Sequence, residues 1–377
     1  MKLHKYILLL LFFVVSIIDA KEYLYTNVPN DLPSNIVNTT FGKELVNLIN
    51  NSKEEISFAI YGLRGQDDVL EALINAKNRG VKITGVVDSD SHDKNYYSDT
   101  HKLYEHFSIV SDHKSYIMHN KFFIFDKKIV WSGSSNISDT GTGGYNANNS
   151  MVIEDKKIAN IYLDEFAQMY KGKFGIWKKE NSFEDIKTDE SIISVYFSPK
   201  SKTYESSIKK LIQNAHKYIY IPIFYLTHKD LTEELLKAHK RGVEIKIILD
   251  ASAARNKYSM HNILRDKGIQ VKIENFGGKM HAKSMIIDDE YFISGSMNFT
   301  KAGEQKNDEN TIIVKNTKLA KQYKSYFLVL WDLIPNKYLY VEPNPESFES
   351  LNSCIDGIDN DFDGKIDITD ELCKRGK

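Results

Sequence analysis

Residues 73–88 read LINAKNRGVKITGVVD, and residues 235–250 read LLKAHKRGVEIKIILD. Both stretches contain Arg-Gly-Val and end in an aspartate, and Asp88 and Asp250 are 162 positions apart. Residues 48–61 and 211–224, just upstream, resemble each other in a similar way. Self-similarity at a fixed offset marks a repeated structural unit. The chain therefore contains two copies of one domain.

Each copy alternates helical and strand patterns. In the first copy the predicted elements are a helix over 41–50, a strand over 56–61, a helix over 69–78 and a strand over 81–87. Gly80 and Gly242 stand where the end of a helix often needs left-handed backbone. This alternation predicts an α/β fold with two pseudo-symmetric halves, each a mixed β-sheet flanked by helices.

The composition of the 377-residue chain excludes several classes of protein. With 42% hydrophobic residues the chain can bury a sizeable core, which excludes wholesale disorder. Its 50 basic and 51 acidic residues nearly cancel, which excludes a strongly basic nucleic-acid tether. Two cysteines exclude a disulfide-rich scaffold and a cysteine-based zinc cluster.

The N-terminus has the pattern of an export signal. Lys2 and Lys5 precede an apolar run of roughly 13 residues that ends before Asp19 and Ala20, which is short for a membrane span of about 20 residues. Ile18 is an imperfect residue at the cleavage site, so an uncleaved N-terminal membrane anchor is the alternative. We expect a secreted or periplasmic protein. The predicted division is a signal peptide over 1–20, halves over 21–180 and 190–345, and an acidic tail over 346–377, with 178–190 as the linker.

Both copies carry the pattern H-x-K-x4-D-x6-G-S-x-N. Its members are His119, Lys121, Asp126, Ser134 and Asn136 in the first copy, and His281, Lys283, Asp288, Ser296 and Asn298 in the second. The alternation of a strand places His119 and Lys121 on one face. The glycine before Ser134 lets the backbone approach, so that Ser134 and Asn136 can reach the same pocket.

This set of side chains suits transfer at a phosphodiester. Lysine ammonium groups and asparagine amides can bind the phosphate oxygens. One imidazole can attack phosphorus while a second, protonated imidazole donates to the leaving oxygen, and the two copies supply one each. Asp126 and Asp288 either take part in the chemistry or only bind turn amides or a buried cation.

The paired motif resembles that of the phospholipase D superfamily, and the resemblance extends from about Tyr23 to Tyr340. It implies one active site at the interface of the two halves, a covalent phosphohistidine on His119 and His281 as the acid, with no cofactor or metal needed for catalysis. Residues 299–310 resemble a segment in which a glutamate orients the imidazole, which implies that Glu304 serves His281. The orienting group of His119 stays open, with Asp139 as one candidate.

The tail has a pattern of its own. Between residues 346 and 377 there are nine acidic and four basic residues. The spacing of an EF-hand calcium loop is reproduced by Asp359, Asp361, Asp363, Gly364, Lys365, Asp367 and Asp370. We expect a structural calcium ion there, the alternative being a solvated acidic tail with two idle thiols. Cys354 and Cys373 bracket the loop and would pair outside the cytoplasm, contributing about 3 kcal/mol. Because the duplicated core looks complete, truncation before Ser353 is expected to preserve activity.

Three functions compete at this stage. The first is a phospholipase D-type enzyme acting on a phospholipid at a membrane surface, and the second is a nonspecific nuclease using the same chemistry on nucleic acid. The third is a non-catalytic binding module, against which two intact motifs argue. Outside the signal and the tail the chain has 44 basic and 41 acidic residues, which supports a nucleic-acid groove only weakly. We favour the lipid enzyme, and no obligate protein partner is evident.

Overall fold

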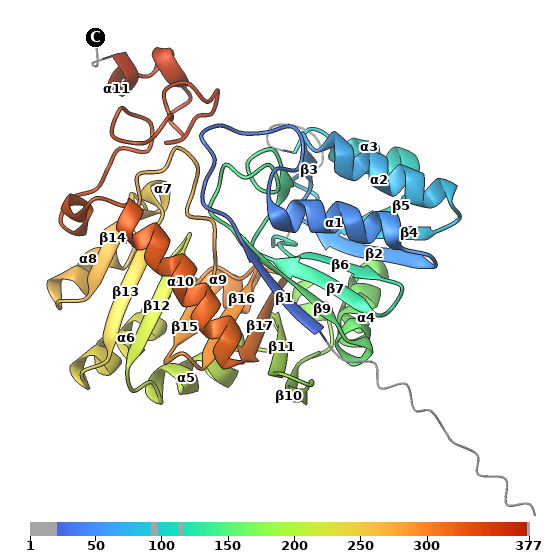
Figure 1. The fold of residues 1–377 in the computed structure, drawn as a ribbon, viewed down its shortest axis with the longest axis horizontal. Coiled ribbons are helices and arrows are strands. Elements are labelled where there is room, and N and C mark those ends of the chain that lie inside the picture. Colours follow the sequence, from blue (N-terminus) through green and yellow to red (C-terminus); the bar gives the residue numbers. More distant parts are fainter. Residues whose placement is uncertain (1–20, 92–96, 113–115, 375–377) are drawn as a thin grey trace, which may run out of the picture.

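The computed structural model describes residues 21–91, 97–112 and 116–374. The predicted signal peptide, residues 1–20, lies outside the described residues. Two α/β halves stand side by side, each built around one large mixed sheet (Figure 1). In the described part of the chain, no helix is both long and apolar enough to cross a membrane.

The first half forms a seven-stranded sheet. In spatial order its strands are β1 (Lys21–Thr26), β9 (Asn149–Glu154), β7 (Ile129–Gly133), β6 (Lys121–Phe125), β2 (Glu55–Ile60), β4 (Lys82–Val87) and β5 (Ser108–Ser111). β2, β4 and β5 run parallel to one another, and the remaining neighbours are antiparallel. A separate short pair joins β3 (Leu63–Arg64) to β8 (Ile137–Ser138).

The second half repeats this order in an eight-stranded sheet. Its strands are β10 (Phe183–Lys187), β11 (Ile192–Ser198), β17 (Glu309–Lys315), β16 (Tyr291–Gly295), β15 (Met285–Ile287), β12 (Tyr218–Ile223), β13 (Glu244–Leu249) and β14 (Gln270–Ile273). β12, β13 and β14 are parallel, as β2, β4 and β5 are in the first sheet. From β11 onward the two sheets match strand for strand, which confirms the duplicated α/β fold.

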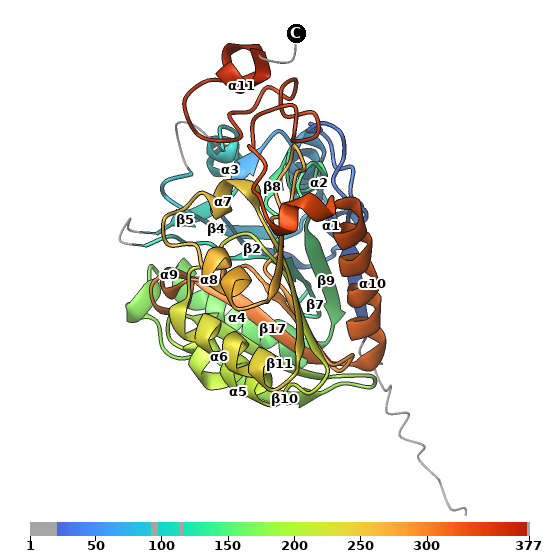
Figure 2. The ribbon, with the colours of Figure 1, turned by 90° about the vertical axis from the view of Figure 1, so that its left-hand side faces the viewer.

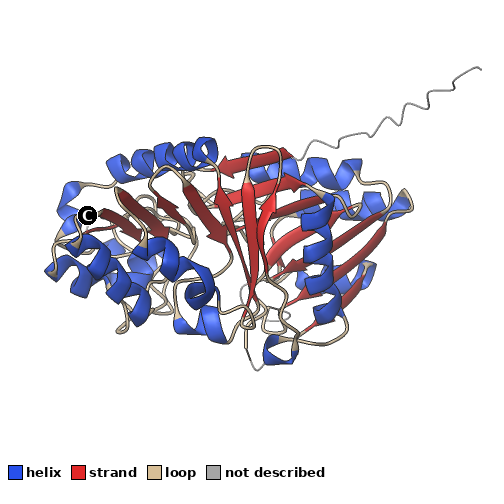
Figure 3. Cartoon of the chain, turned by 90° about the horizontal axis from the view of Figure 1, so that it is seen from below, coloured by secondary structure: helices blue, strands red, loops and turns tan. Residues whose placement is uncertain are grey.

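Helices cover the faces of the two sheets. Their bounds are α1 (Thr40–Asn51), α2 (Asp67–Asn78), α3 (Thr100–His106), α4 (Lys156–Tyr170), α5 (Lys209–Gln213), α6 (Lys229–Lys240), α7 (Ala251–Ala254), α8 (His261–Asp266), α9 (Lys301–Gln305), α10 (Thr317–Leu333) and α11 (Glu371–Lys374). α1 and α2 share a core with the first sheet, and α5 and α6 with the second. α4 and α10 share one core with both sheets. Figure 3 shows the strands of the two sheets meeting in the middle of the molecule, and in Figure 2 α10 lies along one side of the sheets.

The element boundaries follow local chemistry. The Thr39 side chain caps α1 by accepting the N–H of Gly42 at 3.0 Å. Gly80 and Gly242 follow α2 and α6 with φ of +93° and +97°, as predicted. The segment 178–190, predicted to link the two halves, also contributes structure of its own: β10 adds a strand to the edge of the second sheet, and Lys178 is buried.

Lys178 ties the halves together. Its ammonium contacts the carboxylates of Glu165 on α4 and of Asp308, the latter at 2.6 Å, and all three side chains are at most 2% exposed. Asp308 also accepts the N–H of Gly175 at 2.9 Å. Since Glu165 belongs to the first half and Asp308 to the second, the lysine neutralises carboxylates of both.

Lys178→Met should lower the free energy of unfolding by about 3–5 kcal/mol, because it leaves two buried carboxylates without their cation. Urea unfolding of the two proteins measures the difference. The exposed neighbour provides the control, and Lys179→Met should change stability by no more than about 0.5 kcal/mol. Equal midpoints for Lys178→Met and the parent chain would contradict a structural role for this cluster.

Candidate active site

The two motif histidines lie where the halves meet. The backbone N–H of His119 donates to the carbonyl of Asp308 at 2.9 Å, and that of His281 donates to the carbonyl of Ala147 at 2.9 Å. Each histidine is therefore hydrogen-bonded to the backbone of the opposite half. One cavity of about 170 Å³ is lined by Asn136 of the first half and His281 of the second. The fold thus brings the two motifs to one interface.

The imidazole partners also come from the opposite half. Nδ1 of His119 lies 2.8 Å from Oε2 of the buried Glu309, at the start of β17. Nδ1 of His281 lies 3.1 Å from Oδ1 of the buried Asn148, just before β9. Glu309 and Asn148 hold matching places in the two sheets, since the carbonyls of the next residues, Asn310 and Asn149, lie against the matching glycines Gly295 and Gly133. One imidazole faces a carboxylate, and the other faces a neutral amide.

The predicted orienting acids were wrong. Glu304 lies on α9, where it pairs with Nε2 of His228 at 2.8 Å and accepts the N–H of Glu205, so it does not serve His281. Asp139 pairs with Arg64 at 2.6 Å and does not serve His119. Both predictions searched within one copy, whereas each partner crosses the interface. Aligning 148–149 with 309–310 shows that these residues correspond, but only the packing of the two halves shows that each segment faces the histidine of the other copy.

The motif lysines are buried. Nζ of Lys121 donates to the carbonyl of His119 at 2.8 Å, and Nζ of Lys283 donates to that of His281. Burial lowers the pKa of Lys121 to about 7. Burial lowers the pKa of Lys283 well below its ordinary value, and the charge of Lys121 adds to this effect. Burial disfavours the charged forms of both lysines. A bound phosphate, whose negative charge attracts the ammonium groups, would favour the charged forms.

The histidines differ electrostatically. Burial lowers the pKa of His119, and the carboxylate of Glu309 opposes that decrease. Burial lowers the pKa of His281 well below its ordinary value, and the cations of Lys283 and Lys121 lower it further. The sequence pattern gives His281 an acidic partner and His119 none, whereas the structure places the carboxylate beside His119 and an amide beside His281.

The two motif asparagines are placed differently, since Asn298 is not among the residues that line the cavity. Asn136 lines the cavity with His281, and its buried side-chain oxygen accepts no hydrogen bond within the described residues. Oδ1 of Asn298 accepts the N–H of Tyr225 at 3.4 Å, a long contact. Ser134 serves a different purpose, because its hydroxyl donates to Oδ1 of Asn148 at 2.9 Å and so helps to fix the partner of His281.

Asp126 and Asp288 lie outside the site. Asp126 accepts the backbone N–H groups of residues 53–55, and Asp288 accepts those of residues 216–218. Seven residues of extended chain, about 23 Å, separate each aspartate from its histidine. Of the two alternatives left open by the sequence, the structure therefore supports the turn anchor, and the direct chemical role was wrong.

A second pair of aspartates, whose role the sequence did not disclose, supports the site. The carboxylate of Asp88 accepts the N–H of Met118 at 2.8 Å, and that of Asp250 accepts the N–H of Met280 at 3.1 Å. Burial and then the charge of Asp112 raise the pKa of Asp88 to about 7. These are the aspartates that end the two repeated stretches, and they hold the residue before each motif histidine.

The acidic tail forms part of the cavity wall. Asn360 and Phe362 line the cavity together with Asn136 and His281. Figure 1 shows the tail, in red, at the end of the molecule where loops of both halves gather. The two intact motifs predict a duplicated core that is complete without the tail. The structure corrects that view, because the tail closes one side of the candidate site.

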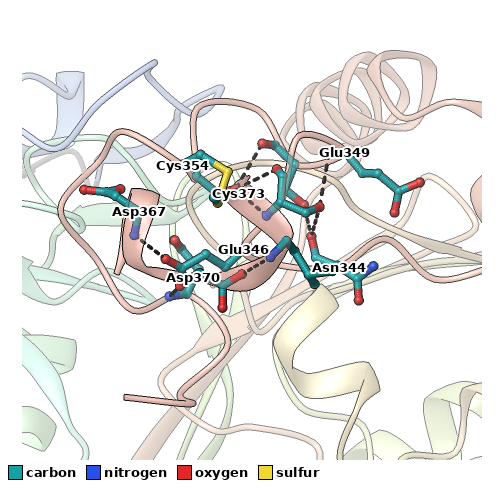
Figure 4. The surroundings of a disulfide bond; sticks show 12 residues. Asn344, Glu346, Glu349, Cys354, Asp367, Asp370 and Cys373 are labelled. Carbon is teal, nitrogen blue, oxygen red and sulfur yellow. Dashed lines mark hydrogen bonds between the residues drawn. A yellow bond between two sulfur atoms is a disulfide. The ribbon is translucent and has the colours of Figure 1, made fainter. Parts of the chain in front are cut away.

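The tail is internally braced. Cys354 and Cys373 form the predicted disulfide, with their Cα atoms 5.5 Å apart (Figure 4). The carboxylate of the buried Glu346 accepts the N–H groups of Asn360 at 2.8 Å and Asp367 at 2.6 Å. Burial raises the pKa of Glu346 to about 7.

Most of the predicted metal ligands lie close together. Carboxylate oxygens of Glu346, Asp359 and Asp361 lie within 4.8 Å of one another, and so do those of Asp361, Asp363 and Asp370. Such oxygen sets suit Ca²⁺.

Of the two remaining members of the predicted set, Asp367 accepts the N–H of Gly357. Lys365 would offer only its backbone carbonyl to a metal, and its ammonium lies 3.7 Å from Asp363. Glu346 was missed because it precedes the loop pattern. Calcium binding stays a prediction.

Comparison with known proteins bears on both halves. Residues 45–170 and 208–331 match the family model described as "Cardiolipin synthase, PLD-like domain". A phospholipase D of Rickettsia bellii is 36% identical over 139 residues, which make up 37% of this chain and 68% of that protein. A mitochondrial cardiolipin hydrolase of Chlamydomonas reinhardtii is 31% identical over 120 residues, which make up 32% of this chain and 54% of that protein. The crystal structure of the phosphatidylserine synthase of Haemophilus influenzae has a TM-score of 0.62 at 13% identity, covering 81% of this chain and 88% of that one, which shows likeness of fold alone.

Proposed function

Because this chain belongs to the phospholipase D-like family and is a phosphodiesterase, we propose that it cleaves a phospholipid through a covalent phosphohistidine. The observation that carries the proposal is the interface itself. It holds two imidazoles, of which one faces a carboxylate and the other an amide, beside two buried lysines. This is a set able to bind one phosphate and to divide attack and proton transfer between two groups.

In the proposed first step, Nε2 of His119 attacks phosphorus. A nitrogen–phosphorus bond forms, the bond from phosphorus to the leaving alcohol breaks, and His281 gives its proton to that alcohol. The charge that develops on the His119 ring is stabilised through Nδ1–H by Glu309, 2.8 Å away. In the second step the neutral His281 takes a proton from water, which attacks phosphorus and releases His119 and a phosphate monoester.

The remaining groups hold the phosphate. Lys121 and Lys283 supply the cations. Burial makes their charged forms unfavourable unless an anion is bound. The amide of Asn136 faces the same cavity as His281. A negatively charged phosphate would also raise the pKa of His281, since it offsets the neighbouring lysine charges. Binding of the substrate would therefore help to protonate the acid that the first step requires.

Two considerations support a lipid substrate over nucleic acid. The relatives reported above carry the names phospholipase D and cardiolipin hydrolase. Outside the signal and tail regions the chain has a net charge of only +3, whereas a nucleic-acid groove gains affinity from each phosphate it neutralises.

A paired assay tests the choice of substrate. Residues 21–377 and the His119→Ala variant are incubated with cardiolipin vesicles, phosphatidylglycerol vesicles and plasmid DNA at low salt. The parent chain should release a lipid monoester, the variant should not, and DNA should stay intact. Cleavage of DNA without cleavage of lipid would overturn the lipid proposal, and failure to cleave any diester would overturn the mechanism.

We further propose that the protein is exported. The predicted signal peptide and the Cys354–Cys373 disulfide support this, because disulfides persist chiefly in oxidising compartments. Expression of the full chain followed by cell fractionation and N-terminal sequencing tests it. A mature terminus near Lys21 in the periplasm or medium is expected, and a reduced cytoplasmic protein would contradict the proposal.

The tail is expected to bind Ca²⁺ through the two clusters of three carboxylates described above. Titration calorimetry of residues 21–377 should show calcium binding, and Asp361→Asn should abolish it, because Asp361 belongs to both groups. Chelation should speed proteolysis within 346–377 without abolishing turnover of bis(p-nitrophenyl) phosphate. Absence of binding heat at millimolar calcium would leave the acidic stretch as a solvated tail.

A further inference from the structure

A lysine outside the two motifs lies in the same cavity. Lys279 precedes His281 by two residues and lines the cavity with it. Its ammonium lies 3.9 Å from the ring centroid of Phe362 in the tail and 5.7 Å from that of Phe224. Each ring face attracts the cation. The lysine is thus positioned between an aromatic ring of the second half and one of the tail.

This cation has no ion-pair partner among the residues that the structure describes. The carboxylates of Asp250, Glu274 and Asp359 act on it only at longer range. A lysine usually extends its flexible stem to keep the ammonium in water. Here the ammonium is held at the cavity wall beside His281, where burial lowers its pKa. An incoming anion would compensate this charge.

The position has no counterpart in the duplicated machinery. His119 and His281 are 162 positions apart. At the same offset, the residue of the first copy that corresponds to Lys279 is Ile117, which carries no charge. The partner ring, Phe362, comes from a tail that follows the second copy. Both the cation and its aromatic clamp therefore belong to the His281 end of the site. The other cation that lines the cavity, Arg64 of the first half, is neutralised by Asp139 at 2.6 Å, so Lys279 is the cation that an anion meets at the His281 end of the site.

The tail is seated firmly enough to form a wall. The side-chain amide of Asn360 donates to the carbonyl of Gly277 at 3.0 Å, and Asp361 pairs with Arg255 at 2.8 Å. Tyr145 of the first half donates to Asp356. A Cβ atom at Gly277 would lie 2.0 Å from the Tyr145 hydroxyl, so only glycine allows this close approach.

We propose that Lys279, held between Phe224 and Phe362, binds a second phosphate of the substrate, and that the tail closes this subsite. The proposal rests on the proposed function, in which His281 protonates the leaving alcohol. Since Lys279 lies beside His281, the second phosphate belongs to that leaving alcohol. The substrate class is then a phospholipid whose headgroup alcohol carries another phosphate, as in cardiolipin.

Two further groups fit such a headgroup. The side-chain oxygens of Asn136 and Asn360 line the cavity, are buried, and accept no hydrogen bond within the described residues. Buried acceptors of this kind normally have a donor. A hydroxyl on the alcohol that links the two phosphates would supply one. The cavity, about 170 Å³, has room for a group of this size.

Substrate comparison tests the subsite. The ratio kcat/KM is measured for cardiolipin, for phosphatidylglycerol, which lacks the second phosphate, and for bis(p-nitrophenyl) phosphate. Lys279→Met should lower kcat/KM for cardiolipin by about 10- to 100-fold, the range for loss of a hydrogen bond to a charged group. The other two substrates should change less than about two-fold. Lys279→Arg, which keeps the charge, should retain most of the cardiolipin activity, and the exposed Lys257→Met should leave all three unchanged.

A substitution at Phe362 tests the aromatic contact with Lys279 separately. Phe362→Ala should lower kcat/KM for cardiolipin by about five-fold, the value of a cation–π contact near 1 kcal/mol, and should spare phosphatidylglycerol. Equal losses on all three substrates for Lys279→Met, or no loss on cardiolipin, would overturn the subsite. If the parent chain cleaves no diester, the proposed function itself is contradicted, whatever the Lys279 variants show. If Lys279→Met impairs only cleavage of a single-stranded oligonucleotide, the assignment to a lipid is overturned.

Discussion

His119→Ala is expected to abolish turnover of every phosphodiester, with a loss of about 10⁴-fold or more, because the variant lacks the nucleophile. His281→Ala should behave differently with bis(p-nitrophenyl) phosphate. The p-nitrophenolate leaving group needs no proton, so attack by His119 can still occur. The second step then lacks the base that activates water. This variant should therefore release one equivalent of p-nitrophenolate and stop.

The covalent species distinguishes the two histidines. Intact-mass measurement of His281→Ala after mixing should show one added phosphoryl ester, and peptide mapping should locate it on His119. His119→Ala should show none, and the exposed His216→Ala should turn over normally. A phosphoryl group found on His281 in the His119→Ala protein would reverse the proposed roles. No adduct in either variant would contradict a phosphohistidine altogether.

Glu309→Gln is expected to lower kcat by about 10³- to 10⁴-fold while leaving the fold intact, because the amide keeps the hydrogen bond to His119 but loses the charge that stabilises the cationic ring. The pH profile should change as well. Glu309 opposes the decrease of the His119 pKa caused by burial, so its removal lowers that pKa further. Since attack needs neutral His119, the acid limb of kcat/KM should move to lower pH.

The matched exchange at the other histidine is Asn148→Asp. It places a carboxylate at the atom now 3.1 Å from Nδ1 of His281. A carboxylate favours the protonated imidazole, so the pKa of His281 rises. Because the acid must be protonated, activity is lost as pH rises through this pKa, and the basic limb of kcat/KM should move to higher pH.

The parent chain sets the reference for both variants. Burial and the lysine charges lower the pKa of His281 well below its ordinary value, so the basic limb of the parent should lie below pH 6.5. A substrate with an alkyl leaving group is required, since p-nitrophenolate leaves unprotonated. Asn148→Gln keeps an amide and should not shift the limb. A basic limb that stays in place in Asn148→Asp would show that His281 is not the acid.

Local patterns predicted the elements of this fold correctly. The helical spacing over 41–50 and 69–78 became α1 and α2, and the strand patterns over 56–61 and 81–87 became β2 and β4. These features depend on residues close in sequence, where periodicity and turn chemistry decide the structure. The pairing of Cys354 with Cys373 was predictable for a similar reason, because these are the chain's two cysteines and they bracket one short loop.

The residues that cross between halves were not predictable in this way. Asn149 on β9 donates to Ser294 on β16, and Asn310 on β17 donates to Ser132 on β7 at 2.8 Å, so the two halves exchange equivalent contacts where their sheets meet. This packing brings Glu309 to His119, 190 positions away. An alignment of one copy with the other shows which residues correspond, but not which residues of one copy face the other. Glu304 and Asp139 were chosen from nearby positions for that reason.

By itself, the amino-acid sequence determined a duplicated α/β chain, a pair of histidine–lysine motifs and a loop closed by two cysteines, because repeats, periodicity and spacing are recorded along the chain. Only the tertiary structure decided that the imidazole partners are exchanged between halves and unequal in charge, and that the tail forms a wall of the cavity. Those features depend on contacts between distant surfaces, such as Tyr145 with Asp356, 211 positions apart. Packing of the two halves and the tail creates such contacts, and no local pattern encodes them.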